Sequence, residues 1–104
     1  MSRILSYTSD ARRDLEAIAA YIVSNAHDLE APDALLRRLK LKCEQLATLP
    51  GLLGTSRTEL ADELRSTPCG PFIIFFRYHG DLIEIVNVLR SSRDIDAHFG
   101  TLSA

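Results

Sequence analysis

The second half of the chain contains basic side chains of the types that a metal-free ribonuclease site uses. They stand near the ends of apolar, strand-like segments and comprise Arg65, Arg77, His79, Arg90 and Arg93. A metal-free ribonuclease needs a base for the 2′-hydroxyl, a cation for the phosphorane and an acid for the leaving oxygen. His79 can act as the base and an arginine as the cation. However, Tyr78 points to the opposite face of its strand from Arg77 and His79, and a histidine that begins a hairpin turn is more often merely exposed.

Other catalytic and metal-binding patterns are absent from the sequence. The glycines stand singly, so there is no glycine-rich phosphate loop, and there is no HExxH motif or nucleophile elbow. Asp62 and Glu63 are adjacent on a polar stretch, which favours a solvated face over an acid–base pair. Cys43 and Cys69 form no CxxC pair and, with three scattered histidines, no zinc pattern. We therefore expect no catalytic residue, no metal and no cofactor.

The composition is that of one ordinary domain with nearly balanced charge. The 104 residues carry 12 Lys+Arg against 14 Asp+Glu, a formal charge of −2, and 46% of them are hydrophobic. We expect a single domain over residues 1–104, since domains commonly have about 100–200 residues. The faint negative charge argues against electrostatic binding of DNA or RNA. No apolar run approaches the roughly 20 residues that span a bilayer, and the start lacks a signal-peptide core, so we expect a cytoplasmic protein without a membrane segment.

The second half of the chain contains arginine but no lysine. Its arginines are Arg57, Arg65, Arg77, Arg90 and Arg93. Arginine suits fixed, bidentate recognition of carboxylates, phosphates and carbonyls, whereas lysine supplies a mobile point charge. We expect these arginines to lie beside the sheet as the only concentrated cationic feature, and to contact a protein partner rather than an RNA backbone.

The first half of the sequence predicts a strand followed by two helices. Ile4–Tyr7 is a short apolar strand, and Thr8–Asp10 supplies the capping chemistry of a helix that ends near Asn25. After a polar connection, Pro32 begins a second helix that Pro50 and Gly51 terminate. The apolar stripe of this helix consists of Leu35, Leu39, Cys43 and Leu46. Cys43 is therefore interpreted as a small core residue rather than a reactive thiol.

The second half predicts the rest of an antiparallel sheet. Gly51–Thr58 is expected to be a loop, residues 60–66 a short helical turn or the entry to a strand, and Thr67–Pro71 a turn. Phe72–Phe76 is a short apolar run that indicates a central strand covered on both faces. A hairpin turn at His79–Asp81 leads to the partner strand Leu82–Leu89. The tail from Ile95 is expected to make one helical turn. The order β-α-α-β-β-β gives an α+β fold, with a helical hairpin packed on an antiparallel sheet.

Five motifs in register resemble the ParE-type toxins of the RelE/ParE superfamily, over about Ile4 to Asp96. They are Ser9-x-Ala11-x-x-Asp14-Leu15-x-x-Ile18-x-x-Tyr21-Ile22; Cys43-x-x-Leu46-x-x-x-Pro50; Gly54-x-x-Arg57-x-Glu59-Leu60 with Leu64-Arg65-Ser66; Phe72-Ile73-Ile74-Phe75-Phe76-Arg77; and Ile83-Glu84-Ile85-Val86-x-Val88-Leu89-x-x-Ser92-Arg93-Asp94-Ile95. The resemblance implies the RelE/ParE fold. It also implies a toxin of a type II toxin–antitoxin module that poisons DNA gyrase.

The same resemblance implies a ParD-like antitoxin whose C-terminal segment wraps the toxin, partly in the groove between the helical hairpin and the sheet. One departure is Arg90, where many relatives have histidine. RelE-type relatives cut mRNA on the ribosome with basic, His, Glu or Tyr side chains around the sheet and the tail. Here the tail Asp96–Phe99 has one histidine and no tyrosine, which weakens the ribonuclease hypothesis.

A disordered antitoxin that folds on binding needs an apolar surface to offset its ordering cost. Leucines outside the predicted core stripes are the candidates: Leu29, Leu36, Leu41 and Leu49. Leu36 and Leu41 are too apolar for a purely solvated face, and the alternative is that they pack under the loop or against the sheet. The five arginines are candidates for contacts with acidic groups of either the antitoxin or gyrase.

Our leading hypothesis is a non-enzymatic ParE-type toxin that inhibits gyrase by protein–protein contact, binds an antitoxin and does not bind nucleic acid by itself. The alternative is a RelE-type endoribonuclease that uses Arg65, Arg77, His79 and Arg90. A third possibility is an inactive relic that only binds its partner.

Overall fold

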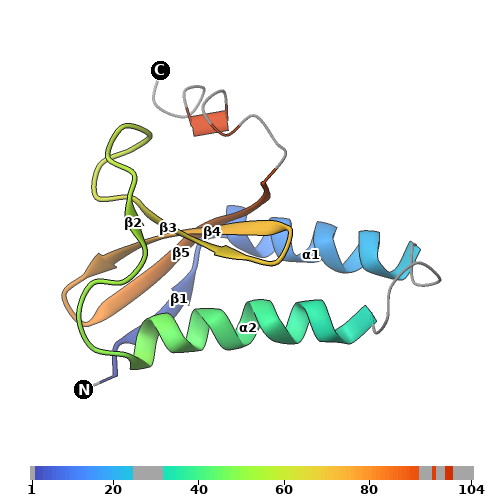
Figure 1. Cartoon of the computed structure of the whole chain (residues 1–104), viewed down its shortest axis with the longest axis horizontal. Helices are drawn as coiled ribbons and strands as arrows, with labels where there is room; N and C mark the ends of the chain where they lie inside the picture. Colours follow the sequence, from blue (N-terminus) through green and yellow to red (C-terminus); the bar gives the residue numbers. More distant parts are fainter. Residues whose placement is uncertain (1, 25–31, 92–94, 96–97, 100–104) are drawn as a thin grey trace.

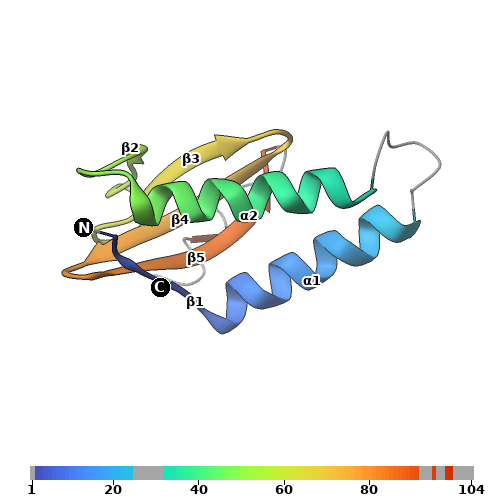
Figure 2. The ribbon, with the colours of Figure 1, turned by 90° about the horizontal axis from the view of Figure 1, so that it is seen from below.

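Two helices pack against one face of a five-stranded sheet in the computed structural model (Figure 1). The structure describes residues 2–24, 32–91, 95 and 98–99. The elements in chain order are β1 (Ile4–Tyr7), α1 (Ser9–Ser24), α2 (Pro32–Thr48), β2 (Thr55–Ser56), β3 (Arg65–Cys69), β4 (Phe72–His79) and β5 (Leu82–Arg90). From below, both helices are seen to lie across the same side of the strands (Figure 2). The predicted α+β fold is confirmed.

The start of α1 follows from its capping residue. Thr8 Oγ1 accepts a hydrogen bond from the Ala11 N–H at 3.0 Å, and the Thr8 carbonyl accepts the first helical bond, from the Arg12 N–H, at 3.0 Å. Asp10 places a negative charge in the first turn, where the helix dipole stabilises it. The predicted capping segment is therefore confirmed, with Thr8 as the cap.

The strands lie in the order β1-β5-β4-β3-β2, so β4 is central. It pairs antiparallel with β3 and with β5, and Gly80 (φ +54°) lies in the tight turn between β4 and β5. β1 is the exception to the antiparallel expectation, because it pairs parallel with β5 from Ile4↔Leu82 to Tyr7↔Ile85. A parallel pair is possible here because α1 and α2 intervene between the two strands and the chain returns through the rest of the sheet.

Two predictions for the middle of the chain were wrong in detail. The expected loop Gly51–Thr58 contains β2, which pairs with the start of β3. The expected turn Thr67–Pro71 is mostly strand: β3 continues through Pro68 to Cys69, and only Gly70 and Pro71 turn. Pro68 is tolerated because β2 covers only Arg65 and Ser66, which leaves the outer edge of β3 open where proline's missing N–H breaks no ladder bond.

Apolar side chains cover both faces of β4, as predicted. Phe72, Ile74 and Phe76 pack in the core beneath the helices. Ile73 and Phe75 point to the far face, where a second cluster forms with the buried side chains of Leu64, Leu89 and Phe99. Cys43 is 1% exposed within the first core, which confirms it as a packing residue.

Candidate functional site

A groove of about 400 Å³ opens between α1 and the adjoining ends of β4 and β5. Its apolar lining comes from Ala17, Ile18, Phe72, Val88 and Leu89, and its polar groups are those of Asp14, Tyr21 and Arg90. We call this feature the α1–sheet groove. The helical spacing of Asp14, Ala17, Ile18 and Tyr21 places all four side chains along one side of α1. The result is an apolar floor with an anion and a cation at its margins, which is a surface suited to a polypeptide.

Tyr21 and Arg90 stack across this groove. The guanidinium carbon of Arg90 lies 4.3 Å from the centroid of the Tyr21 ring, and the tyrosine remains 45% exposed. A cation over an aromatic face is held by the ring quadrupole. The stack therefore ties the end of β5 to α1 while keeping both side chains within reach of a partner.

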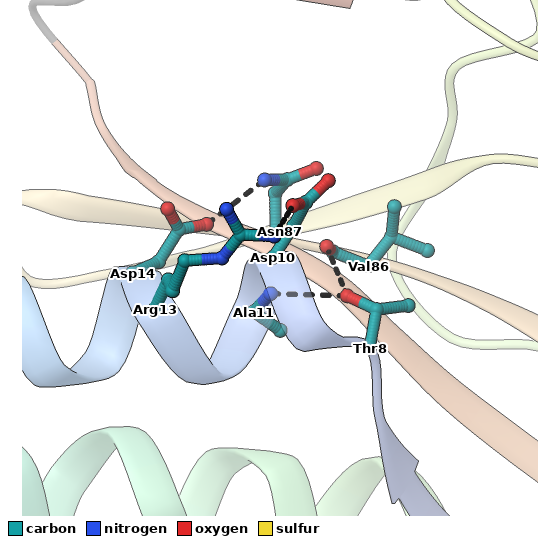
Figure 3. Close-up of polar contacts among 7 residues, drawn as sticks. All are labelled: Thr8, Asp10, Ala11, Arg13, Asp14, Val86 and Asn87. Atoms are coloured by element: carbon teal, nitrogen blue, oxygen red, sulfur yellow. Dashed lines mark hydrogen bonds and ion pairs between the residues drawn. The ribbon is translucent and has the colours of Figure 1, made fainter.

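Asp14 holds α1 against β5 at the other side of the groove (Figure 3). Its Oδ2 accepts hydrogen bonds from Asn87 Nδ2 and from the Val88 N–H, both at 2.9 Å. Next to it, Thr8 Oγ1 donates to the Val86 carbonyl at 2.7 Å (Figure 3). These bonds occupy the edge of β5 beyond Ile85, where its pairing with β1 stops.

A β-bulge in β5 lies at the same place. Phe75 pairs with Asn87 and Phe76 with Ile85, so Val86 is the extra residue. A bulge disrupts the ladder locally and leaves backbone groups to find other partners. On either side of the Asn87 backbone, the Val86 carbonyl and the Val88 N–H are bonded by the side chains of Thr8 and Asp14, on the edge of β5 that β1 leaves free.

Arg65 and Arg57 are engaged in local structure. Arg65 donates from Nε to the Leu53 carbonyl at 2.7 Å and from Nη2 to the Gly54 carbonyl at 3.1 Å. Arg57 donates from Nε to Ser66 Oγ at 2.9 Å and lies 3.5 Å from a Glu59 carboxylate oxygen. Arg65 thus serves to hold the segment between α2 and β2.

Arg77 and His79 lie on the far face of the sheet, each near a carboxylate. Arg77 pairs with Glu84 across β4 and β5, with 3.9 Å between Nε and Oε1. His79 Nδ1 lies 3.9 Å from a Glu63 oxygen. Tyr78 lies on the opposite, helix-facing side, as predicted, and its ring stacks with Arg3 at 4.3 Å.

The predicted site residues therefore do not form one cluster. Arg90 lines the α1–sheet groove, Arg65 binds carbonyls near β2, and Arg77 lies on the far face. Arg93 lies outside the described residues. The expectation of a single cationic feature beside the sheet is wrong, because four consecutive or near-consecutive cations stand instead on α2: Arg37, Arg38, Lys40 and Lys42.

The leucine candidates also have different environments. Leu36 is partly buried against the helix-side core, so the alternative prediction of internal packing holds for it. Leu41 is 55% exposed and Leu49 is 48% exposed, while Leu29 lies outside the described residues. Leu41 lines a second groove, of about 280 Å³, between α2 and β3.

Asn87 and Tyr21 were not among the predicted site residues, although the sequence carries a signal for each. Asn87 is a single amide within the apolar strand Leu82–Leu89, and a buried amide needs a hydrogen-bond partner. Tyr21 is a large aromatic side chain off the core stripe of α1. Among the described residues no cluster of His, Cys, Asp or Glu is placed to hold a metal ion. In the same part of the chain no helix has the length and apolar content needed to cross a membrane.

Comparison with known proteins identifies the family. The model of the family described as "ParE toxin of type II toxin-antitoxin system, parDE" matches residues 5–95. A solved structure described as a chromosomal ParDE TA system from P. aeruginosa has the same fold, with a TM-score of 0.65 and 24% identity over 86% of this chain and 96% of that one. A search of curated proteins found no match. The family match spans nearly the whole chain, and this chain therefore belongs to the ParE toxin family of type II toxin–antitoxin systems.

Proposed function

We propose that the chain is a single-domain, non-enzymatic toxin that acts in the cytoplasm, inhibits DNA gyrase by protein–protein contact and is silenced by a ParD-like antitoxin. Membership of the ParE family supports a toxin with an antitoxin partner. The choice between protein contact and catalysis rests on the arrangement of the side chains.

The α1–sheet groove is the observation that carries the proposal. Its floor offers the apolar area that a folding-on-binding antitoxin segment needs, and Arg90 at its margin offers a charge-assisted contact for an acidic side chain. The charged groups of this groove are engaged within the chain, because Asp14 accepts the Val88 N–H and Arg90 stacks on the Tyr21 ring, which disfavours an acid–base role for them.

The ribonuclease alternative is disfavoured by the dispersal of its residues. Arg65 is anchored to two carbonyls, Arg77 and His79 face carboxylates on the far face, and Arg90 stacks on α1. A phosphorane clamp needs a cation and a base within about 3 Å of the same reacting group. These four side chains would have to leave their present partners to meet.

Two assays on the purified chain decide between the hypotheses. We expect inhibition of gyrase-catalysed supercoiling or accumulation of cleaved DNA, and intact mRNA on programmed ribosomes. Codon-dependent mRNA cuts that disappear in His79→Ala or Arg77→Ala would overturn the proposal in favour of the ribonuclease. An effect on neither target, with antitoxin binding retained, would identify an inactive relic.

A further inference from the structure

The outer edge of β1 offers main-chain groups that can pair with another strand. β1 is the last strand at its side of the sheet, next to β5 (Figure 2). The Ile4 N–H donates to the Asp81 carbonyl at 2.7 Å, so the main-chain groups of Ile4 face β5. Because these groups alternate between the two sides of a strand, those of Leu5 and Tyr7 point outward. Within the part of the chain that the structure describes, no main-chain group pairs with them there.

The two edges of the sheet differ in their protection against such pairing. Natural edge strands are commonly shortened, charged, bulged or interrupted by proline, which prevents pairing with another chain. The opposite edge has this protection, because β2 contains two residues and the part of β3 beyond it contains Pro68. β1 contains four residues, Ile4–Tyr7, with no charge and no proline. It is therefore the edge that is suited to pairing.

Exposed apolar side chains accompany this edge on the far face of the sheet. The side chains of Leu5 and Tyr7 pack partly against the helix-side core, so those of Ile4 and Ser6 point to the far face. Ile4 is 65% exposed, and Leu82, its partner in the β1–β5 pair, is 41% exposed. Neither belongs to the buried cluster of the far face. A strand that pairs with β1 would cover part of this apolar surface.

We propose that two copies of this chain associate through β1, with the two outer edges paired antiparallel about a two-fold axis at Ser6. In this register Leu5 of each copy lies opposite Tyr7 of the other, and the two pairs exchange four N–H···O=C bonds. A register centred on Leu5 would pair Tyr7 with Arg3 instead. The Arg3 N–H already donates to the Ala47 carbonyl at 2.9 Å, so that register would lose part of its ladder.

A second copy of the chain is the favoured occupant because the edge is complementary to itself. The two Ser6 residues come opposite each other in the close, non-hydrogen-bonded position, where small side chains fit. Ile4 of each copy lies diagonally beside the serine of the other copy, within reach of a side-chain contact. Residues 4–8 carry no charge, so the pairing brings no like charges opposite each other.

The paired edge and the α1–sheet groove lie along different parts of β5. β1 lies beside residues 82–85, whereas the groove is lined by Val88, Leu89 and Arg90. Two paired copies would thus form one continuous sheet that presents a groove from each copy. This inference needs neither gyrase nor an antitoxin, and it does not rest on the proposed function.

Sedimentation of the purified full chain over a range of concentrations measures the association. Because four-residue edges bury less than the roughly 1,200 Å² of a standard interface, we expect a weak dimer with a dissociation constant of about 10–100 µM. Ser6→Lys should weaken it at least about tenfold, since two bulky like charges meet at the axis. The fold should persist, because Glu84 is the pairing partner of Ser6 within one copy. The matched control is Thr55→Lys, on the exposed β2 edge, with an expected change below about twofold.

A cysteine at the axis tests the register directly. Ser6→Cys would place two thiols on residues whose Cα atoms are about 4.5 Å apart, within the range of a disulfide. With oxygen as oxidant, the two thiols lose two electrons and two protons, the S–S bond forms and oxygen becomes hydrogen peroxide. We expect a covalent dimer on non-reducing gels for Ser6→Cys and none for Thr55→Cys. The native Cys43 and Cys69 are buried, so the wild-type chain should form none either.

Each outcome supports or overturns the pairing of β1 edges. A wild-type chain that stays monomeric at about 1 mM would overturn it, as would a dimer that Ser6→Lys does not weaken or equal cross-linking of Ser6→Cys and Thr55→Cys. If Ser6→Lys does not fold, Ile4→Lys at the exposed neighbouring position takes its place, with an expected weakening of at least about fivefold. A monomeric wild type whose antitoxin affinity falls in Ser6→Lys would assign the edge to the antitoxin instead. Failure of gyrase inhibition or of antitoxin binding would overturn only the proposed function.

Discussion

Asp14 in α1 and Asn87 in β5 are joined by a 2.9 Å hydrogen bond, and the same Asp14 oxygen accepts the Val88 N–H at 2.9 Å. One carboxylate oxygen thus receives two donors from the bulged strand. The aspartate belongs to the motif that opens the family resemblance, and its contacts are with the protein's own backbone and core. Its role in the site is therefore to position α1, and with it one wall of the α1–sheet groove.

Replacing Asp14 by alanine should lower the free energy of unfolding by about 1–3 kcal/mol, because the Val88 N–H and the Asn87 amide both lose their acceptor. Asp14→Asn, which keeps one oxygen acceptor, should lose less. Denaturant titration provides the measurement, and Glu16→Ala, an exposed acid on the same helix, is the control with an expected change within about 0.5 kcal/mol. Equal losses for Asp14→Ala and Glu16→Ala would contradict a positioning role.

Gly54 and Gly51 provide a matched pair for the segment that Arg65 holds. Both have positive φ, +73° and +82°. A β-carbon on Gly54 would lie 2.5 Å from the Ser66 carbonyl oxygen, whereas one on Gly51 would meet nothing within 4 Å. Gly51→Ala should cost about 1–2 kcal/mol from the backbone conformation alone, and Gly54→Ala about 1–3 kcal/mol more from the steric overlap. If thermal or denaturant unfolding gives the two variants equal stability, Gly54 does not lie this close to Ser66 of β3.

The elements that the sequence predicted well are those with a strong local pattern. The 3.6-residue spacing and the caps located both helices, and the apolar run Phe72–Phe76 identified the central strand. β3 was missed at its end because Pro68 and Gly70 are turn residues in isolation, and only the open edge makes a proline acceptable within the strand. The short β2 has no pattern of its own.

The site was harder to predict because its contacts join residues far apart in sequence. The contacts of Tyr21 with Arg90 and of Asp14 with Asn87 form only when the bulged strand β5 packs beside α1. The use of arginine in place of lysine correctly indicated that Arg65 makes fixed contacts. Those contacts proved to be with the chain's own carbonyls. Side-chain type alone does not specify whether a contact is internal or with a partner.

Cys43 should make the protein less stable at alkaline pH. Burial raises the pKa of its thiol to about 11, a rise that the hydrogen bond with Tyr7 only partly offsets. Because the unfolded thiol ionises near pH 8.5, the stabilising difference is present below that pH and is lost as pH rises toward 11, by about 2–3 kcal/mol. Urea midpoints at pH 8 and pH 10.5 measure the loss. Cys43→Ala should show a smaller loss between these two values, and an equal one would contradict this assignment.

Phe99 should be essential for covering the far face of the sheet. It is 2% exposed, and its ring lies 4.8 Å from that of Phe75. Phe99→Ala should lower the free energy of unfolding by about 3 kcal/mol, since it removes a buried aromatic side chain. The comparison is Leu52→Ala, where a 63% exposed side chain is removed and the expected change is within about 0.5 kcal/mol. A Phe99→Ala protein as stable as Leu52→Ala would mean that the far face does not depend on the tail.

The Tyr21–Arg90 stack should contribute to antitoxin affinity, because it fixes a cation at the margin of an apolar groove. A cation–π contact at an exposed site is worth about 0.5–1 kcal/mol. Tyr21→Leu keeps apolar area but frees Arg90, so it should weaken binding about two- to fivefold through the lost positioning of the guanidinium. Arg90→Gln should weaken binding at least as much, and the double variant should lose less than the product of the single losses, because both act through one contact.

Independent, multiplicative effects in titrations with the antitoxin would show that the two side chains do not act as a unit. Unfolding curves for the same variants provide the control, since a loss of affinity without loss of fold places the effect at the groove.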